Sequence, residues 1–300
     1  MDLTSLYNHI KDKPVFIRKR LQEAQDNMES LRQGDLGWGE TDLDGEEWNP
    51  DSSLDPSQPA RIHYESYQDM AQMLFGPDPI IPVGLRPSME IQNPSYDVND
   101  PKFRQWEKVW VQSTEREKLL SCINNSNRHS PITQIVCIGL GIPQGEGEDE
   151  DDPEVEKRNY VQHLAVRDMA QELARLQNTD VRVFAQDPQY NEDDKTLLEK
   201  LSITIVNDPE AFLKIDESTF VVAICTSFPV RQVVADLFLE RGTKGPAGIW
   251  GHFDPGSDDP ASERVDTMMS NFVGIWTIGE GDEFWNYFGD SRFSWKRRDG

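Results

Sequence analysis

The chain has 300 residues and a mass of 34.4 kDa, which is enough for one large domain or two small ones. Lysine and arginine together number 30 against 54 aspartate and glutamate residues, so the formal net charge is −24. This excess of acid argues against binding to nucleic acid or to an anionic membrane, and no apolar run approaches the roughly 20 residues that span a bilayer.

The three cysteines form no closely spaced pair, so the sequence predicts neither a disulfide framework nor a cysteine-bound metal. The first residues lack the apolar core of a secretory signal. We therefore expect a protein of the cytoplasm, the nucleus or both, with no metal site.

Residues 1–34 are predicted to form an N-terminal helical segment, and residues 35–59 an acidic disordered linker. The linker holds eight acids and no base between positions 35 and 55. Such a segment repels itself and buries too little apolar surface to offset the entropy of ordering it. An alternative is an acidic docking peptide for a basic partner, with Trp38 and Trp48 as its anchors.

Residues 60–130 are predicted to form a helical extension that packs on the following domain. Apolar side chains at three- and four-residue steps indicate a short amphipathic helix over 60–75, and the prolines that follow indicate irregular structure. One long helix is expected over 100–124, because Asp100 is a suitable N-cap and Pro101 suits the first helical position.

From residue 131 to residue 300, apolar β-branched runs alternate with helical patterns. Strands are expected at 132–141, 181–188, 203–208, 219–227 and 247–253, and helices at 158–177, 192–202 and 230–242. Strands separated by helices of this length predict an α/β domain with a Rossmann-like, doubly wound, mainly parallel sheet and helices on both faces. Eight acids and one base at 144–157 indicate a solvated loop, and the aromatic C-terminal tail is expected to pack on the domain edge.

In such a sheet, ligands bind beyond the carboxyl ends of the strands, where the strand order reverses. The residues predicted at these ends are Gly139, Gly141, Asp187, Asp208, Thr226 and Ser227. The two glycines allow a tight turn and close approach of a ligand, and Asp187 is placed to accept hydrogen bonds from a ribose. These residues predict a pocket for a nucleotide-like molecule or S-adenosylmethionine, without identifying which cofactor.

The match to the dinucleotide fingerprint is incomplete, because Gln144 stands where a third glycine is expected. The acids that follow would compete with a phosphate for the same backbone donors. The glycines are therefore interpreted first as residues that permit a strand-to-loop turn.

No catalytic constellation is evident. His163 lies alone on a predicted helix, where a histidine is more often a packing or surface residue than a catalytic base, and Asp193 and Asp194 are explained as helix caps. Cys225 stands at a strand end, but no histidine lies nearby in the sequence to activate it. The sequence therefore predicts no catalytic residues and gives no support for an enzyme.

The motifs FRQWEKVW, ITQIVCIGLG, RNYVQHLAVRDMAQEL, VFAQDPQYNEDDKTLLEKL and CTSFPVRQVV follow one another in the order of a known family. Over roughly residues 100–250 the chain resembles the SRR-like domain, named for "sensitivity to red light reduced", in a divergent form similar to fungal members. The family commonly has a Pro-His-Cys motif after the fourth strand, whereas this chain has Ser227, Phe228 and Pro229. The resemblance implies a regulatory role in signalling or circadian-type regulation, with a link to haem metabolism elsewhere in the family.

Two functions follow. The first is a non-enzymatic regulatory or interaction protein that recruits protein partners, most simply through their basic surfaces. The second is an enzyme or sensor that binds a nucleotide-like cofactor or S-adenosylmethionine at the strand ends. The second requires an open pocket lined by Gly139, Asp187 and Ser227, whereas the first predicts an edge that is shallow or filled by side chains such as Phe228.

Overall fold

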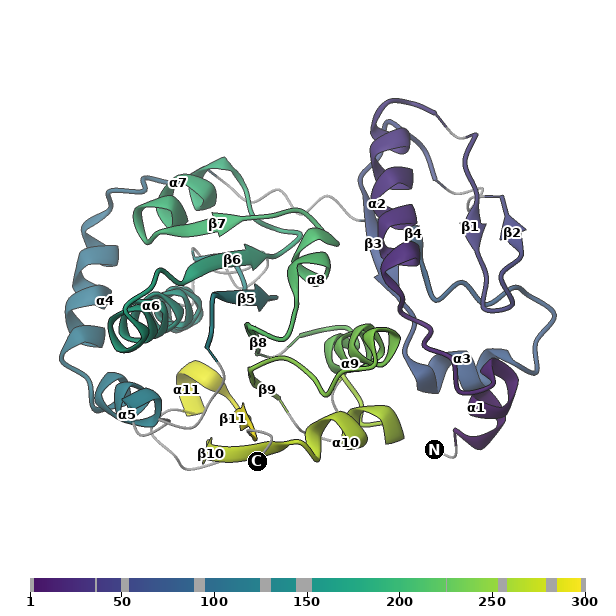
Figure 1. Ribbon diagram of the computed structural model, residues 1–300. Helices are drawn as coiled ribbons and strands as arrows, with labels where there is room; N and C mark the ends of the chain where they lie inside the picture. Colours follow the sequence, from purple (N-terminus) through teal and green to yellow (C-terminus); the bar gives the residue numbers. More distant parts are fainter. Residues whose placement is uncertain are drawn as a thin grey trace.

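The computed structural model describes residues 3–35, 37–49, 54–88, 95–124, 131–143, 153–224, 226–252, 258–278 and 285–297. An α/β unit built on one large sheet follows residue 95, and an N-terminal layer, residues 3–88, lies against one side of it (Figure 1). None of the helices in these described ranges is both long enough and apolar enough to cross a membrane.

The large sheet has seven strands in the order β10-β11-β9-β8-β5-β6-β7. Their bounds are β5 Gln134–Ile138, β6 Arg182–Gln186, β7 Ile203–Ile205, β8 Thr219–Ala223, β9 Gly248–His252, β10 Phe272–Thr277 and β11 Ser291–Lys296. The five strands from β7 to β9 are parallel, and β11 runs antiparallel to both β9 and β10. The chain winds from β5 first toward β7 and then, through β8, toward β9, so the strand order reverses between β5 and β8.

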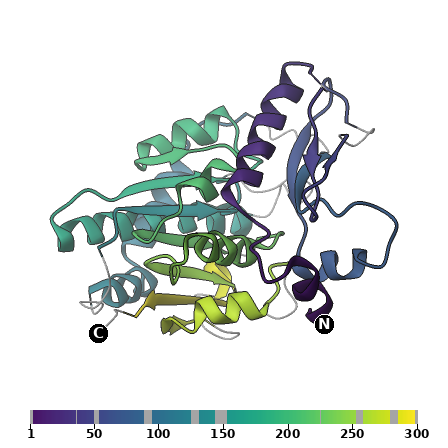
Figure 2. The same cartoon turned by 45° about the vertical axis from the view of Figure 1, so that its right-hand side comes forward.

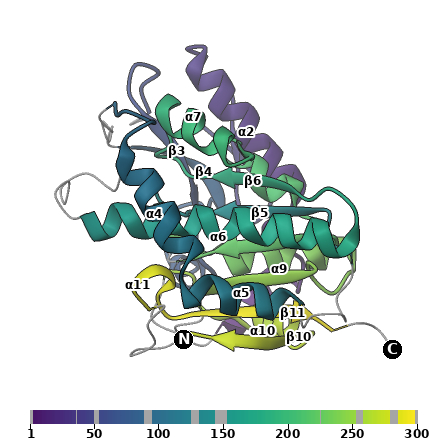
Figure 3. The same ribbon diagram turned by 90° about the vertical axis from the view of Figure 1, so that its left-hand side faces the viewer.

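Helices cover both faces of this sheet (Figure 3). One face carries α4 Pro101–Val111, α5 Thr114–Asn124, α6 Pro153–Gln177, α7 Glu192–Lys200 and α11 Trp285–Phe288. The other face carries α8 Glu210–Lys214, α9 Val230–Arg241 and α10 Glu263–Met269. The central strand shows why its sequence is apolar throughout. Ile135 and Cys137 pack in the cluster that contains α6, while Val136 and Ile138 pack in the cluster that contains α9.

The N-terminal layer combines three helices with two small antiparallel sheets (Figure 2). Its elements are α1 Thr4–Ile10, α2 Arg18–Arg32, β1 Glu40–Thr41, β2 Glu47–Trp48, β3 Ala60–Tyr64, α3 Tyr67–Met73 and β4 Val83–Pro87. β3 pairs with β4, and β1 pairs with β2. The buried side chains of this layer join those of α8 and α9 in a single hydrophobic cluster.

The predicted fold class is confirmed, but the extension is not purely helical. Residues 60–75 were expected to form one helix, whereas β3 ends at Tyr64 and α3 begins after Ser66, whose hydroxyl caps the backbone N–H of Asp69. The proline-rich stretch contains β4, because its central residues pair with β3 and only the last is a proline. The helix predicted over 100–124 is two helices, because the Ser113 hydroxyl caps a new N-terminus.

Residues 37–49 form a β1–β2 hairpin, in contrast to the disorder that their charge predicts. Two of the acids are internal hydrogen-bond acceptors rather than solvated charges. Glu40 accepts the backbone N–H of Leu85 at 2.5 Å, and Asp42 accepts the indole N–H of Trp48 at 2.7 Å. Most of the predicted acidic loop, residues 144–152, lies outside the described residues, and its remainder begins α6.

A carboxylate on α9 holds the N-terminal layer to the large sheet. Asp236 is completely buried, and its Oδ2 accepts the backbone N–H groups of Val15 at 2.6 Å and Phe16 at 2.9 Å. Its Oδ1 accepts from Arg264 at 2.7 Å, and that guanidinium also donates to the carbonyl of Lys13. One buried acid therefore joins α9, α10 and the segment between α1 and α2.

We expect Asp236→Ala to lower the free energy of unfolding by about 3–5 kcal/mol, because it leaves a buried arginine and two backbone N–H groups without their acceptor. Urea denaturation would measure the change. Asp180→Ala, which removes an exposed acid beyond the end of α6, should stay within about 0.5 kcal/mol of wild type. Equal stabilities of the two variants would contradict the anchoring role.

Candidate functional site

A cavity of about 300 Å³, here called the strand-end cavity, lies beyond the carboxyl ends of β5, β6, β7 and β8. All six residues predicted for a ligand site line it, namely Gly139, Gly141, Asp187, Asp208, Thr226 and Ser227. Its other lining residues are Arg61, Ile62, His63, Tyr64, Gln186, Pro188, Gln189 and Phe228. The volume is at the lower end of the range for small-molecule sites.

The two glycines make the turn that opens the cavity. Gly139 has φ +67° and Gly141 has φ +72°, in the left-handed region that favours glycine. A Cβ at Gly141 would lie only 2.6 Å from Nδ2 of Asn159. The N–H of Gly139 donates to the Gln186 carbonyl at 2.9 Å, and that of Gly141 to Oδ2 of Asp187 at 3.0 Å. These two amides are therefore used within the protein and are not presented to a phosphate.

Asp187 holds the loops around the cavity. Besides the N–H of Gly141 on Oδ2, it accepts the N–H of Gln189 on Oδ1 at 3.0 Å. The carboxylate thus joins the turn after β5 to the turn after β6. A ligand hydroxyl bound to Asp187, as the sequence predicts, would share this carboxylate with the two loop amides.

Asp208 is half-buried and accepts hydrogen bonds from two buried residues. Its Oδ1 accepts the Tyr64 hydroxyl at 2.5 Å and Nε2 of Gln186 at 2.9 Å. Burial raises the pKa of Asp208 to about 7, although both donors favour the charged form. Burial also raises the pKa of the Tyr64 hydroxyl, so tyrosine remains the donor. The group places a carboxyl that titrates near neutral pH at the wall of the cavity.

Two aromatic rings line the cavity where the N-terminal layer meets the large sheet. Tyr64 on β3 stacks on Phe228, with ring centroids 5.3 Å apart and an interplanar angle of 20°. Tyr64 also contacts Phe212 on α8 at 5.4 Å. Phe228 therefore lines the cavity without filling it, as the ligand-binding hypothesis requires.

The two residues after β8 differ in role. Thr226 is half-buried and sits against the turn, since its Cγ2 would lie 3.1 Å from a Cβ at Gly139. Ser227 is exposed and borders a second depression of about 310 Å³, lined also by Ser66, Asp69 and Pro229. Cys225 lies outside the described residues.

The N-terminus of α9, close to the cavity, is already occupied by a carboxylate. Asp259 accepts the backbone N–H of Arg231 at 3.0 Å and forms an ion pair with its side chain at the same distance. Both side chains are buried. This helix end consequently offers no free site for an anion.

His163 is the packing residue that the sequence predicts. It is completely buried, with Nδ1 2.7 Å from the Asn159 carbonyl and Nε2 2.8 Å from the Tyr190 hydroxyl. Burial lowers the pKa of His163 to about 4, so the ring is neutral at pH 7. Asp194 belongs to the capping box of α7, as expected, although the N-cap itself is Asn191.

Sequence reasoning missed the contribution of β3, which supplies Arg61, His63 and Tyr64 to the cavity. The signal was the alternation of buried Ile62 and Tyr64 with polar neighbours, which is typical of a strand. A helix is predicted there instead, because Tyr64, Tyr67, Ala71 and Leu74 also have helical spacing, although the chain breaks at Ser66. Within the described ranges, no cluster of three or more His, Cys, Asp or Glu could hold a metal.

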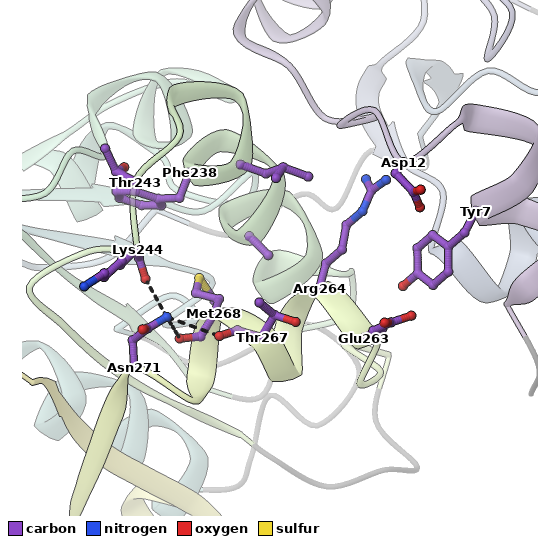
Figure 4. A pocket seen from close by; sticks show the side chains of 12 residues that line it. Tyr7, Asp12, Phe238, Thr243, Lys244, Glu263, Arg264, Thr267, Met268 and Asn271 are labelled. Atoms are coloured by element: carbon purple, nitrogen blue, oxygen red, sulfur yellow. Dashed lines mark hydrogen bonds between the residues drawn. The ribbon is translucent and has the colours of Figure 1, made fainter.

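A second cavity, of about 380 Å³, lies where α1, α9 and α10 meet (Figure 4). Phe238 and Met268 contribute apolar wall, while Tyr7 and Asp12 face Arg264 and Glu263 across it. The Arg264 guanidinium lies over the ring of Tyr7 at 5.3 Å and is bonded to Asp236. This cavity therefore adjoins the contacts that anchor the N-terminal layer.

Residues 111–239 match the family model of the SRR1 domain. A search of curated proteins found no match. Among solved structures, the chain is similar to a variant of MtNAS crystallised in complex with S-adenosylmethionine, with 13% identity over 65% of this chain and 72% of that chain and a TM-score of 0.31.

We expect Gly141→Ala to destabilise the protein more than Gly242→Ala does. Both glycines have positive φ, which costs an alanine about 1–2 kcal/mol, but no atom lies within 4 Å of a Cβ at Gly242. The clash with Asn159 should add about 1–3 kcal/mol at Gly141. Denaturation midpoints would measure the difference, and equal losses would show that the turn has room for a side chain.

Asp208→Asn should change how stability depends on pH. The folded state holds the Asp208 proton more tightly than the unfolded chain does, so this group's contribution to stability falls as pH rises from about 4 to 7. Asparagine keeps an acceptor for Tyr64 and Gln186 without the charge. The variant's stability relative to wild type should rise across that window, by at most about 1.4 kcal/mol per pH unit, and then level off. A difference that does not vary with pH would contradict the assignment.

Proposed function

We propose that this protein is a regulatory, non-enzymatic binding protein whose SRR1 domain takes a nucleotide-like molecule or S-adenosylmethionine in the strand-end cavity. The observation that carries the proposal is the convergence of residues from the ends of four strands on one cavity, at the reversal of strand order.

The chemistry of the lining supports a polar ligand. Asp187 and Asp208 offer carboxyl oxygens to ligand hydroxyl or amino groups, and Ser227 offers an exposed hydroxyl. Tyr64 and Phe228 supply an apolar wall beside these groups. A small cavity with a few convergent polar groups and one apolar wall is the usual form of a ligand site.

Ligand binding would be tested by a thermal-shift screen of the full chain against adenine nucleotides, NAD(P), S-adenosylmethionine and haem. A ligand at 100 times its dissociation constant adds about 2.7 kcal/mol of stability. We expect one nucleotide-like compound to raise the melting temperature. We expect Ser227→Trp, which introduces a large side chain at the cavity, to remove that shift.

Thr243→Trp is the matched control, because Thr243 is an exposed hydroxyl residue that lines the second cavity near α9 and α10. It should keep the full ligand-induced shift. A shift lost equally in both variants, or no shift with any compound, would contradict binding in the strand-end cavity.

Partner binding is a second candidate function, favoured by the β1–β2 hairpin. Asp44, Glu46 and Glu47 are exposed, and the Trp48 side chain is 45% exposed beside them. An exposed tryptophan among acids suits a partner with a basic surface. Trp38, the other predicted anchor, packs against the hydrophobic cluster instead. We propose that the hairpin recruits such partners in the cytoplasm or the nucleus.

The hairpin would be tested by comparing the proteins that co-purify with wild type, with Trp48→Ala and with Phe75→Ala. Phe75 is 83% exposed and lies outside the hairpin, so its loss controls for general surface hydrophobicity. Partners lost only with Trp48→Ala would support the proposal. A partner set unchanged by Trp48→Ala would remove the hairpin as a docking element.

A further inference from the structure

Arg61 is a cation at the strand-end cavity whose charge no acid among the described residues neutralises. It is exposed, it lines the cavity from β3, and its side chain makes no ion pair or hydrogen bond with any of the described residues. The chain has 54 acids against 30 bases, so an arginine without an acidic partner is unexpected on its surface. His63, the other basic residue of the lining, is bonded to Glu65 at 3.0 Å.

The position of Arg61 in its sheet also places it beside a charge of the same sign. In the β3–β4 pair, Arg61 stands directly opposite Arg86. Like charges at directly opposed positions destabilise an antiparallel pair. Arg86 lies 3.5 Å from the buried carboxylate of Glu40, so its charge is compensated, whereas no acid of the described ranges compensates Arg61. Arg61 thus lies opposite another arginine and beside a cavity, without an acidic partner among the described residues. This arrangement indicates that the charge of Arg61 has a function.

The cavity has no competing anion site among the backbone groups described above. The amides of Gly139 and Gly141 are bonded within the turn, and the N-terminus of α9 is capped by Asp259. The Asp187 carboxylate, which also lines the cavity, would repel an anion from its own neighbourhood. An anionic group on a ligand would therefore be directed toward Arg61.

We propose that Arg61 binds an anionic group of the ligand, a phosphate or a carboxylate, while the hydrogen-bond donors of the same ligand face Asp187 and Asp208. The inference rests on the proposed function, since it assigns one end of the ligand in the strand-end cavity. It makes Arg61 a specificity-determining residue that selects anionic nucleotide-like molecules over uncharged nucleosides.

Two ligand pairs separate the two sources of the anion. Adenosine and adenosine 5′-monophosphate differ by a phosphate, and 5′-methylthioadenosine and S-adenosylhomocysteine differ by an amino-acid group with a carboxylate. Titration calorimetry would compare wild type with Arg61→Gln and Arg104→Gln. Arg104 is an exposed arginine of α4, on the opposite face of the sheet, so its variant controls for net charge.

We expect Arg61→Gln to weaken binding of the phosphate- or carboxylate-bearing member of one pair by about tenfold and to change the affinity for the other member less than twofold. The effect should shrink with added salt, because Arg61 is exposed. Arg104→Gln should leave both members unchanged. Equal losses for the charged and uncharged members, or no loss for either, would overturn the role of Arg61 while leaving ligand binding intact.

Inorganic phosphate tests Arg61 without any nucleoside. At constant ionic strength, phosphate in place of chloride should raise the melting temperature of wild type and Arg104→Gln but not that of Arg61→Gln. Identical responses of wild type and Arg61→Gln would overturn the proposal even if nucleosides bind. A phosphate effect that depends on Arg61, together with no nucleoside binding, would keep the anion site and refute the proposed nucleotide-like ligand.

Discussion

The buried carboxylate of Asp236 is the contact on which the shape of the cavity depends. It accepts two backbone N–H groups from the segment before α2 and pairs with Arg264 of α10, so three parts of the chain meet at one acid. A buried charge is tolerated only when its hydrogen-bonding capacity is used. Here that requirement fixes the N-terminal layer against α9, and the layer in turn presents β3 to the strand ends.

The strand-end cavity is consequently lined by residues from two parts of the fold, the large sheet and the N-terminal layer. The parallel sheet contributes the glycine turn and the carboxyl groups, which are placed by strand ends that any doubly wound fold brings together. Strand β3 of the β3–β4 pair contributes a ring and a cation from outside the large sheet. Tyr64 links the units, because it donates to Asp208 and stacks on Phe228.

The central parallel strands could be predicted because β5 and β8 are buried along their whole length and are mostly apolar in sequence, and the positions of the strand ends followed from them. Other parts needed tertiary information. The acids of residues 37–49 appear solvated in the sequence, but Glu40 and Asp42 accept internal hydrogen bonds. β10 is interrupted by a glycine and a bulge, and the aromatic tail forms β11 inside the sheet rather than at its edge. Arg61 lies opposite Arg86 because β3 pairs with β4, and this pairing cannot be predicted from the local periodicity of the sequence.

The cavity includes residues of β3, which lies outside the region that matches the family model. The family match covers residues 111–239, whereas one wall of the cavity is supplied by residues 61–64. A fragment or a fusion that carries the matched region alone would expose Phe212 and Phe228 where Tyr64 now packs, and would leave Asp208 without its tyrosine donor. Two proteins that share the region matching the SRR1 domain would thus differ in the lining of this cavity wherever they differ in the separate stretch that corresponds to residues 61–64.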